Sequence, residues 1–338
     1  MRIEENVPLS TLTTFKTGGP ARFLVSAESE EDLRSAAAFA KEKNLPLIPL
    51  GGGSNMCAPD RGVEAVFVRF LPHEVSVEKQ GNGVVIVSAD AGLSWDALVA
   101  YASENGWWGL ENLSAIPGTV GASVVQNIGA YGAAAEQHIV SVSALDLETG
   151  AMRTFASDEC AFGYRMSVFK KEADRWFITR VSFRLSAMSQ PDLSYRDLAK
   201  WFEGKGTPSV RDVRDAVIEI RKEKFPPLDE FGTAGSFFLN PVVSHGEAES
   251  MRERFPGMPL FAMPEGGVKA PLAWLFDHVL SLKGMREGGA FVWQKQPLVI
   301  AAERGARSAD VYALAERISA IAREKTGISI APEVRLFR

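Results

Sequence analysis

Two uncharged, glycine-rich stretches are the parts of this sequence best suited to bind a ligand. One runs from Asn112 to Ala122 and continues through Gln126–Gly132, and the other is Leu50–Asn55. Surface loops usually carry charge, and a packed strand does not carry several glycines and a proline. Glycine lets the backbone approach a neighbour closely and tolerates positive φ. The composition therefore predicts close approach of backbone to something large and flat or anionic, with one long ligand held at two places.

A short apolar strand expected at Leu47–Leu50 leads directly into Leu50–Asn55, which is the first of the two stretches in chain order. A strand that ends in a glycine turn commonly presents backbone N–H groups to phosphate. Neither GxGxxG nor GxxxxGK[ST] occurs in the sequence, and Gly51–Met56 fails the first motif because its last position is Met56. The absence of both motifs therefore argues against a standard Rossmann reductase and against a P-loop protein.

Strands and helices intermingle without a regular βαβ series, which predicts an α+β fold. Ser29 with Asp32 is typical of a helix N-terminus, and Asn44-Leu45-Pro46 ends that helix. Apolar periodicity predicts strands at 63–70, 75–77, 84–87, 140–147 and 176–185, with a hairpin turn at Gln80–Gly83. It also predicts helices at 94–103, from Ser209 to Pro226, at 272–279 and at 309–325. The last of these should end at Gly327, and the helix after Ser209 should bury the face made of Val213, Ala216, Val217 and Ile220.

The composition is that of an ordinary globular protein, and its length predicts two or three domains. The net charge of −5 and the absence of a Lys/Arg run argue against nucleic acid as the main partner. Cys57 and Cys160 are too few for a disulfide framework, and we expect both to be reduced, buried thiols. With neither a signal peptide nor a long apolar run, we expect a cytoplasmic protein without a membrane partner. The histidines show no metal-ligand spacing, so we expect no metal: His73, His138, His245 and His278.

Five motifs in order carry a resemblance to a known family. The two glycine stretches resemble the flavin-binding segments of UDP-N-acetylenolpyruvoylglucosamine reductases, which are FAD enzymes of peptidoglycan precursor synthesis. Phe162–Lys170 resembles the family's FGYR(x)S(x)F motif, Ala234–Pro241 its GSFFxNP motif, and Ala331–Arg335 its PEVR tail. The resemblance covers roughly Thr13 to Arg335 and points to the subtype whose tyrosine loop closes over the substrate.

The sequence departs from the family pattern at two positions. Gly52 stands where some relatives carry an acidic residue, and Leu239 stands where a lysine or arginine is common. Neither departure removes a residue that the family uses in catalysis.

The resemblance implies a two-subdomain FAD-binding module of the PCMH/vanillyl-alcohol-oxidase type, followed by a C-terminal α+β substrate domain. We expect FAD-binding subdomains at 1–71 and 72–203 and a substrate domain at 204–326. The segment 327–338 would be a C-terminal strand returning to the flavin site. A change of composition at Gly204–Pro208 agrees with the second boundary.

The implied reaction is cell-wall precursor synthesis, in which UDP-N-acetylglucosamine enolpyruvate becomes UDP-N-acetylmuramate. Hydride passes from NADPH to non-covalent FAD and then to the enolpyruvyl methylene carbon. Arg165 would stabilise the charge that develops on the substrate carboxylate, since arginine is permanently charged and binds carboxylates with two bonds. Ser236 would donate the proton to carbon. Glu333 would act as a protonated donor to the enolate, or alternatively as an anion that holds Arg335.

The resemblance also implies binding residues. Contacts to FAD are expected from Gly51, Gly52, Gly53, Ser54, Asn55, Met56, Ile116, Pro117, Gly118, Gly121, Ala122, Gln126, Asn127, Gly129, Ile178 and Arg335. Substrate contacts are expected from Tyr195, Lys224, Asn240 and Gln296, with Tyr195 closing over the pyrophosphate. We expect the chain to act as a monomer.

Two rival functions remain. One is a flavin oxidase of the same cofactor-binding fold, many of which attach the flavin to a histidine beside the glycine turn. No histidine lies between Gly51 and Val68, which disfavours covalent attachment there. The other is a non-catalytic flavin or nucleotide-sugar sensor, which would need neither Ser236 nor Glu333.

Overall fold

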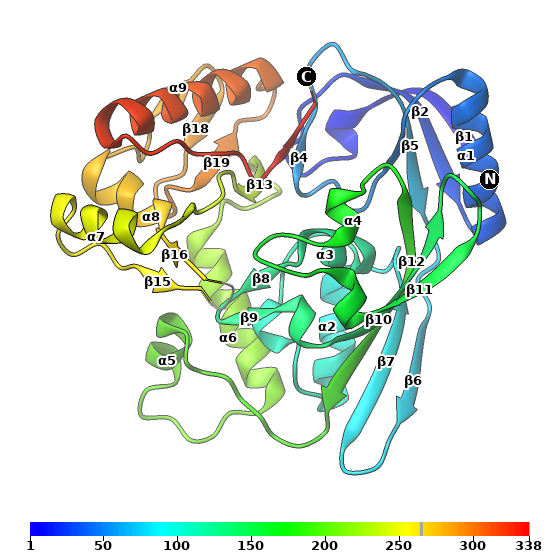
Figure 1. The fold of residues 1–338 in the computed structure, drawn as a ribbon, viewed down its shortest axis with the longest axis horizontal. Coiled ribbons are helices and arrows are strands. Elements are labelled where there is room, and N and C mark those ends of the chain that lie inside the picture. Colours follow the sequence, from blue (N-terminus) through cyan, green and yellow to red (C-terminus); the bar gives the residue numbers. More distant parts are fainter. Residues whose placement is uncertain (264–265, 338) are drawn as a thin grey trace. The chain divides into compact units, whose positions relative to one another are not determined.

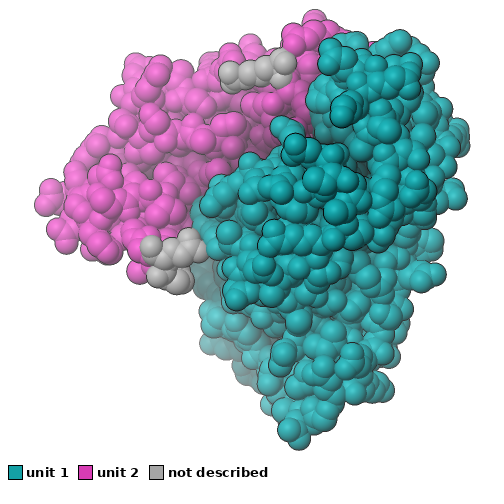
Figure 2. Space-filling view, turned by 45° about the vertical axis from the view of Figure 1, so that its right-hand side comes forward, with its two compact units in different colours: residues 1–7, 21–52, 64–221 teal, residues 8–20, 53–63, 222–338 magenta. Residues whose placement is uncertain are grey.

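The computed structural model describes residues 1–263 and 266–337 (Figure 1). The chain divides into two compact units, shown in different colours in Figure 2. Unit 1 comprises residues 1–7, 21–52 and 64–221, and unit 2 comprises residues 8–20, 53–63 and 222–338. The first glycine stretch is therefore shared, with Gly51 and Gly52 in unit 1 and Gly53 in unit 2.

The last change of unit falls between Arg221 and Lys222, inside a helix, and not at Gly204–Pro208. The predicted division at residues 71, 203 and 326 stays a prediction, because it concerns functional subdomains and the two units follow packing.

Unit 1 contains a four-stranded sheet in the order β1-β2-β5-β3 (Figure 1). Strands β3 and β5 are parallel, with Leu47 opposite Val66. The strands are β1 Arg2–Pro8, β2 Pro20–Ala27, β3 Leu47–Pro49 and β5 Val63–Phe70. The strand predicted at 63–70 is thus confirmed.

Helix α1 (Glu30–Lys43) covers this sheet. Its first turn is capped by the Ser29 hydroxyl, which accepts the Asp32 N–H at 3.1 Å, and left-handed Asn44 ends it. Both ends agree with the sequence prediction. The apolar face packs on β2 and β5 around Leu33, Ala36 and Ala40.

The second sheet of unit 1 has five antiparallel strands in the order β11-β10-β12-β7-β6. Its strands are β6 Val75–Lys79, β7 Val84–Asp90, β10 Ile139–Asp146, β11 Met152–Ala156 and β12 Trp176–Ser186, which confirms the predicted hairpin and the two later strands. Helix α2 (Trp95–Glu104) packs on it, with Trp95 edge-to-face on Phe183 at 5.9 Å between ring centroids.

The second glycine stretch contains a helix that no sequence signal predicted. A 3-10 turn at Glu111–Leu113 precedes helix α3 (Val120–Gln126), and a short hairpin follows, β8 Gly129–Ala130 with β9 Ala133–Ala134. Tertiary packing outweighs the low helix propensity of Gly121, because a Cβ there would lie 2.8 Å from the Ala91 Cβ. The glycine lets α3 approach the end of β7.

Three further helices complete unit 1. They are α4 Val168–Lys171, α5 Arg196–Phe202 and α6 Val210–Lys224, whose last residues pass into unit 2. As predicted, α6 buries one face, which consists of Val213, Ala216, Val217 and Ile220.

Unit 2 is built on a four-stranded sheet in the order β13-β19-β18-β17, with helix α9 (Ser308–Thr326) packed against it (Figure 1). The strands are β13 Gly232–Ser236, β17 Arg286–Glu287, β18 Ala290–Val292 and β19 Val299–Ala302. Helix α9 ends at Gly327, with a φ of 73°, as predicted. Val311, Leu314 and Ile318 are buried, whereas Ile321 is only partly buried.

The helix expected at 272–279 is divided into α8 (Leu272–Trp274) and a π-helical turn at Leu275–Val279. Helix α7 (His245–Arg254) was not predicted, although Ser244 and Glu247 form a capping box that marks its start. The smaller strands are β4 Met56–Cys57, β14 Val242–Val243, β15 Phe261–Ala262, β16 Val268–Lys269 and β20 Arg335–Leu336.

Candidate active site

In unit 1 the two glycine-rich stretches pack directly on each other. A Cβ at Gly52 would lie 2.8 Å from the Cα of Gly118, and one at Gly51 would lie 2.7 Å from the Thr119 hydroxyl. These glycines therefore permit backbone-to-backbone contact within the protein itself. The sequence predicted that the two stretches contact one ligand at separate places. At Gly51 and Gly52 the two stretches instead lie against each other and form a single surface.

That surface retains unused backbone donors. Within residues 1–263 and 266–337, the N–H groups of Gly51, Gly52 and Gly118 donate to no protein acceptor. The first turn of α3, by contrast, is satisfied, since Val120 donates to the Leu93 carbonyl and Gly121 to the Ala91 carbonyl. Backbone N–H groups on glycine fit the oxygens of a flavin ring or a pyrophosphate, so these residues fit FAD.

The Gln126–Gly132 segment, which continues the second glycine stretch, is held by Asn127, which is buried and left-handed at the end of α3. Its amide nitrogen donates to the Glu136 carboxylate (2.8 Å) and to the Gly163 carbonyl (2.9 Å), and its amide oxygen accepts the Glu136 N–H (3.2 Å). Its side chain thus ties together three segments of unit 1. The predicted contact of Asn127 with FAD stays a prediction. The hydrogen bonds of its side chain indicate that Asn127 holds this loop in place.

Arg165 lies against the same motif. Its guanidinium donates to the carbonyls of Asn127 (3.2 Å) and Gly129 (2.7 Å), and its own φ is 54°. Lys170 donates to the Arg165 carbonyl (2.9 Å) and to the Gln126 side chain (3.1 Å), which brings a second cation to this loop. The guanidinium orientation is therefore fixed by the glycine motif before any substrate binds.

Other predicted residues of unit 1 differ in exposure. Ile178 is buried in strand β12, and Ile116 is partly buried against the same core. Tyr195 is 40% exposed at the start of α5, where its ring packs edge-to-face on buried Tyr131 at 5.2 Å between centroids. Burial raises the pKa of Tyr131 to about 12. Tyr131 belongs to the Gln126–Gly132 segment, but no sequence signal predicts its contact with Tyr195.

Unit 2 brings together Ser236 and Glu333, the second and third predicted catalytic residues. The Glu333 N–H donates to the carbonyl of Phe237 at 2.8 Å, and the Leu239 N–H donates to the Ala331 carbonyl at 2.9 Å. The segment after Ser236 therefore pairs with the segment that carries Glu333. Residues almost a hundred positions apart in sequence become backbone neighbours.

Ser236 ends strand β13 at an irregularity in its pairing with β19. Gly235 has a φ of 73°, and the Phe237 N–H returns to the ladder by donating to the Leu298 carbonyl at 2.8 Å. The Ser236 side chain is partly exposed, and its hydroxyl has no hydrogen-bond partner within the part of the chain that the structure describes. A β-bulge that re-aims one side chain is common beside active sites.

The end of the first glycine stretch lies beside Glu333 and Arg335. The Asn55 amide donates to the Glu333 carbonyl at 3.3 Å, and the Arg335 N–H donates to the Asn55 carbonyl at 3.0 Å. Strands β4 and β20 are parallel, with Arg335 opposite Met56. Unit 2 thus groups Asn55 and Met56, predicted FAD contacts, with Glu333 and with exposed Arg335.

The remaining predicted residues of unit 2 have local roles. The Asn240 amide oxygen accepts the Leu272 N–H at 2.9 Å, at the start of α8. Gln296 turns the chain into β19, because its carbonyl accepts the Val299 N–H. Lys224 is the last residue of α6.

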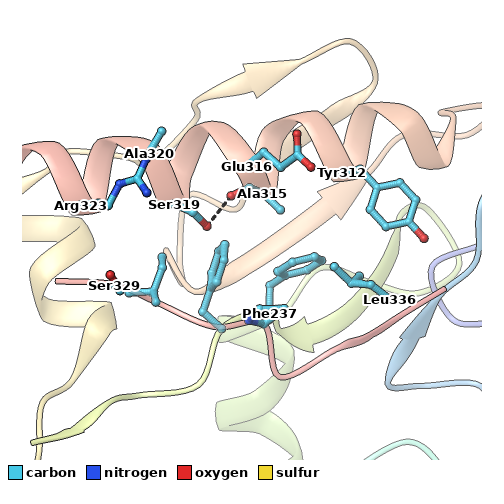
Figure 3. Close-up of a pocket in the computed structure, with 12 residues that line it drawn as sticks. Phe237, Tyr312, Ala315, Glu316, Ser319, Ala320, Arg323, Ser329 and Leu336 are labelled. Atoms are coloured by element: carbon cyan, nitrogen blue, oxygen red, sulfur yellow. Dashed lines mark hydrogen bonds between the residues drawn. The ribbon is translucent and has the colours of Figure 1, made fainter. Parts of the chain in front are cut away.

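A cavity of about 320 Å³ lies in unit 2 between α9 and the tail that carries Glu333 (Figure 3). Its walls include Phe237 and Pro332, the neighbours of Ser236 and Glu333, together with Glu316 and Arg323 of α9. None of the predicted catalytic or binding residues lines it. The cavity is therefore distinct from the candidate site.

Replacement of Gly53 by alanine tests the close packing of the first stretch in unit 2. A Cβ there would lie 2.1 Å from the Leu12 carbonyl oxygen, on a residue whose φ is 60°. We expect Gly53→Ala to lower the free energy of unfolding by about 2 kcal/mol or more and to weaken FAD binding. Chemical denaturation and FAD titration measure the two effects.

Gly246→Ala is the matched control, since no atom lies within 4 Å of a Cβ at this position in α7. It should leave FAD affinity unchanged and stabilise the protein slightly, by about 0.5–1 kcal/mol. A Gly53→Ala protein as stable as wild type would contradict the close packing described here.

Two family models match the chain. The FAD binding domain matches residues 21–156, and the UDP-N-acetylenolpyruvoylglucosamine reductase C-terminal domain matches residues 226–337. UDP-N-acetylenolpyruvoylglucosamine reductase of Pseudomonas aeruginosa is 40% identical over 339 residues, which cover 100% of this chain and 99% of that protein. The chain belongs to the UDP-N-acetylenolpyruvoylglucosamine reductase family. The reductase of Ralstonia nicotianae is 36% identical over 98% of both chains.

A solved structure of the family agrees. The crystal structure of the Thermus caldophilus reductase matches with a TM-score of 0.69 and 25% identity, covering 100% of each chain. The predicted fold class, a PCMH-type FAD-binding module followed by a C-terminal α+β domain, is confirmed. Ser236, Asn240, Gln296, Glu333 and Arg335 lie in the matched C-terminal domain, whereas Arg165, Ile178, Tyr195 and Lys224 lie outside both matched ranges.

Proposed function

We propose that this chain reduces UDP-N-acetylglucosamine enolpyruvate to UDP-N-acetylmuramate, with FAD as non-covalent cofactor and NADPH as hydride donor. One observation supports it most: the backbone pairing of the Ser236 segment with the Glu333 segment, next to Asn55. The proposed proton donor, the carboxyl group of Glu333 and a predicted FAD contact thereby lie on neighbouring segments of unit 2. The family membership supplies the substrate and the reaction class.

FAD, when bound, would supply the hydride chemistry that links NADPH to the enolpyruvyl methylene carbon. The unused N–H donors of Gly51, Gly52 and Gly118 would hold it in unit 1. Arg335, exposed beside Asn55 and Met56, would place positive charge at the flavin ring. Positive charge there favours the reduced, anionic form of the ring.

Arg165 stabilises the negative charge that develops on the substrate carboxylate. Its guanidinium is already oriented by the carbonyls of Asn127 and Gly129, so it needs little reorientation when the negative charge forms on the substrate. Lys170, which donates to the Arg165 carbonyl, fixes the loop that carries it.

Ser236 delivers the proton to the substrate carbon next to the carboxylate. A serine hydroxyl is a weak acid, so transfer requires a strongly basic carbanion and a hydroxyl held within reach. The bulge at Gly235 fixes the backbone on both sides, and no protein acceptor competes for the hydroxyl within the described residues. Glu333 acts as a neutral donor to the enolate oxygen, because a second negative charge beside a forming carbanion would raise the barrier.

The substrate diphosphate and nucleotide are bound by Tyr195, Lys224, Asn240 and Gln296. Lys224 supplies positive charge to a phosphate. Tyr195, exposed and resting on Tyr131, acts as the lid of the tyrosine-loop subtype.

Tyr195→Phe should raise the Michaelis constant for the enolpyruvyl substrate more than it lowers turnover. The hydroxyl contacts the pyrophosphate, remote from the reacting carbon, and a hydrogen bond to a charged group contributes about 1.5–3 kcal/mol. Steady-state kinetics at saturating NADPH measure both constants. An unchanged Michaelis constant would count against Tyr195 as a lid residue.

The protein acts as a monomer in the cytoplasm and needs neither a metal ion nor nucleic acid. Both cysteines are free and buried, as in a reducing compartment. Burial raises the pKa of Cys57 to about 11, which keeps it an unreactive thiol. In the part of the chain that the structure describes, no helix has the length and apolar character to cross a bilayer.

The function is tested with purified protein. We expect a yellow protein that releases unmodified FAD on heating, turns over NADPH beyond one equivalent per flavin only when the enolpyruvyl substrate is present, and yields one lactyl ether per NADPH. NADPH consumption coupled to oxygen alone would favour the flavin oxidase. Binding of the nucleotide sugar without any turnover would favour the sensor.

A further inference from the structure

The peptide units around Ala115, directly before the Ile116-Pro117-Gly118 segment, are bound by two charged side chains. Ala115 has a φ of 56°, a left-handed conformation that a residue with a Cβ adopts only at a steric cost. Its N–H donates to the Asp96 carboxylate at 2.6 Å, and its carbonyl accepts from the Arg221 Nε at 3.2 Å. The surroundings therefore impose this conformation on the chain.

Asp96 belongs to helix α2 and Arg221 to helix α6, both labelled in Figure 1. Arg214, about two helical turns before Arg221, donates two hydrogen bonds to Asp96, at 2.6 and 2.9 Å. Burial by itself would raise the pKa of Asp96, but the bonds from Arg214 and Ala115 hold it below the ordinary value. The carboxylate is thus a fixed anion, and charge-assisted hydrogen bonds of this kind are short and strong.

Arg221 also reaches the tyrosine pair. Its guanidinium hydrogen-bonds the Tyr131 side chain, and Tyr131 packs edge-to-face on Tyr195. Burial lowers the pKa of Arg221, while Tyr131 and Asp96 oppose this effect. A buried cation is retained only when its hydrogen bonds are satisfied, which explains why this arginine has such specific partners.

Asn112 connects the same parts independently. Its amide nitrogen donates to the Tyr131 carbonyl at 3.0 Å and to the Asp192 carbonyl at 2.9 Å, in the loop that precedes Tyr195. Its buried amide oxygen has no partner among the described residues, so the side chain is oriented by its two donors alone. The stretch that begins at Asn112 is therefore bonded to the tyrosine loop.

We propose that Asp96 and Arg221 are positioning residues, which fix the Ala115 turn so that Ile116–Gly121 is shaped for FAD and transmit that constraint through Tyr131 to Tyr195. The inference rests on the proposed function and adds to it a coupling between the cofactor segment and the substrate lid. Neither Asp96 nor Arg221 needs to touch FAD or substrate for this role.

A simpler explanation is that these side chains only dock α6 on α2. Arg211 provides the comparison, because it also bridges the two helices, donating to the Glu104 carbonyl at 3.1 Å, but lies at the surface and does not contact Ala115. Loss of Arg211 should therefore affect docking without affecting the turn.

The first test is titration of FAD-free protein with FAD, for Arg221→Met and the matched control Arg211→Met. We expect the FAD dissociation constant to rise about tenfold or more for Arg221→Met and to stay within about twofold of wild type for Arg211→Met. Arg221→Lys lacks the planar guanidinium that can bind two acceptors, so its FAD dissociation constant should rise as it does in Arg221→Met. The lysine variant replaces the methionine variant in this test if Arg221→Met does not fold. Wild-type FAD affinity in the Arg221 variants, or equal losses at Arg211 and Arg221, would overturn the proposal.

Asp96 gives a second readout through rescue. Asp96→Asn keeps an acceptor for the Ala115 N–H and loses the charge opposite Arg214, whereas Asp96→Ala loses both. We expect FAD affinity within about threefold of wild type for Asn and a loss of about tenfold or more for Ala. Equal losses would mean that the ion pair with Arg214, and not the Ala115 turn, is what matters.

The coupling to Tyr195 is tested in FAD-saturated protein. We expect Arg221→Met and Tyr131→Phe each to raise the Michaelis constant for the enolpyruvyl substrate, and the double variant to raise it no further than the larger single effect. Additive effects would overturn the link through Tyr131. Wild-type protein that neither binds FAD nor turns over would instead contradict the proposed function, so the two failures are distinguishable.

Discussion

Ser236→Ala should leave the reduction of bound flavin by NADPH nearly unchanged and slow its reoxidation by the enolpyruvyl substrate. General acid catalysis contributes about 10²- to 10⁴-fold, so we expect a loss at least of this order in the second half-reaction. Only that half-reaction needs a proton at the substrate carbon. Anaerobic stopped-flow measurement of flavin absorbance separates the two half-reactions.

Ser329→Ala is the control for this experiment, since it removes an exposed hydroxyl of the same unit from a residue outside strand β13. It should leave both half-reactions unchanged. Equal losses in both half-reactions of Ser236→Ala would mean that Ser236 supports the fold of β13 and does not donate the proton.

Substitution at Glu333 distinguishes a neutral donor from an anion. Glu333→Gln keeps the length of the side chain and a donor, whereas Glu333→Asp keeps the charge and shortens the reach. If the neutral form donates to the enolate, Gln should retain more activity than Asp, because a misplacement of about 1 Å can cost 10²-fold. Steady-state and half-reaction rates of both variants provide the comparison.

The anionic role predicts the opposite order. A charged Glu333 would hold Arg335, two residues further along the tail, and Asp would then retain more activity than Gln. Since the backbone of Glu333 is fixed by Phe237 and Asn55, both variants keep the same chain path. Asp clearly more active than Gln would refute the neutral donor while leaving Glu333 in the active site.

Local signals predicted much of the fold. Ser29 with Asp32, the apolar face of α6 and Gly327 after α9 each act within one turn of a helix, and the structure confirms all three. Helix α3 was not predictable in this way. Its glycine is unfavourable in an isolated helix and is favourable here only because Ala91 lies against it.

The sequence named candidate site residues but did not predict how they are arranged. The family motifs named Ser236 and Glu333, yet their adjacency depends on the hydrogen bond between Glu333 and Phe237. Long-range backbone pairing leaves no periodic trace in the sequence. The contacts of Asn127 and Tyr131 illustrate the same limit, because an amide or a tyrosine in a glycine-rich motif does not reveal its partners.

The most direct test of the proposed reaction is a single turnover without oxygen. Protein reduced with one equivalent of NADPH is mixed with UDP-N-acetylglucosamine enolpyruvate, and flavin absorbance is followed while the product is analysed by mass spectrometry. The account predicts that oxidised flavin returns only after the enolpyruvyl substrate is added, with one UDP-N-acetylmuramate formed per flavin. Flavin that stays reduced, or that is reoxidised without this product, would contradict it.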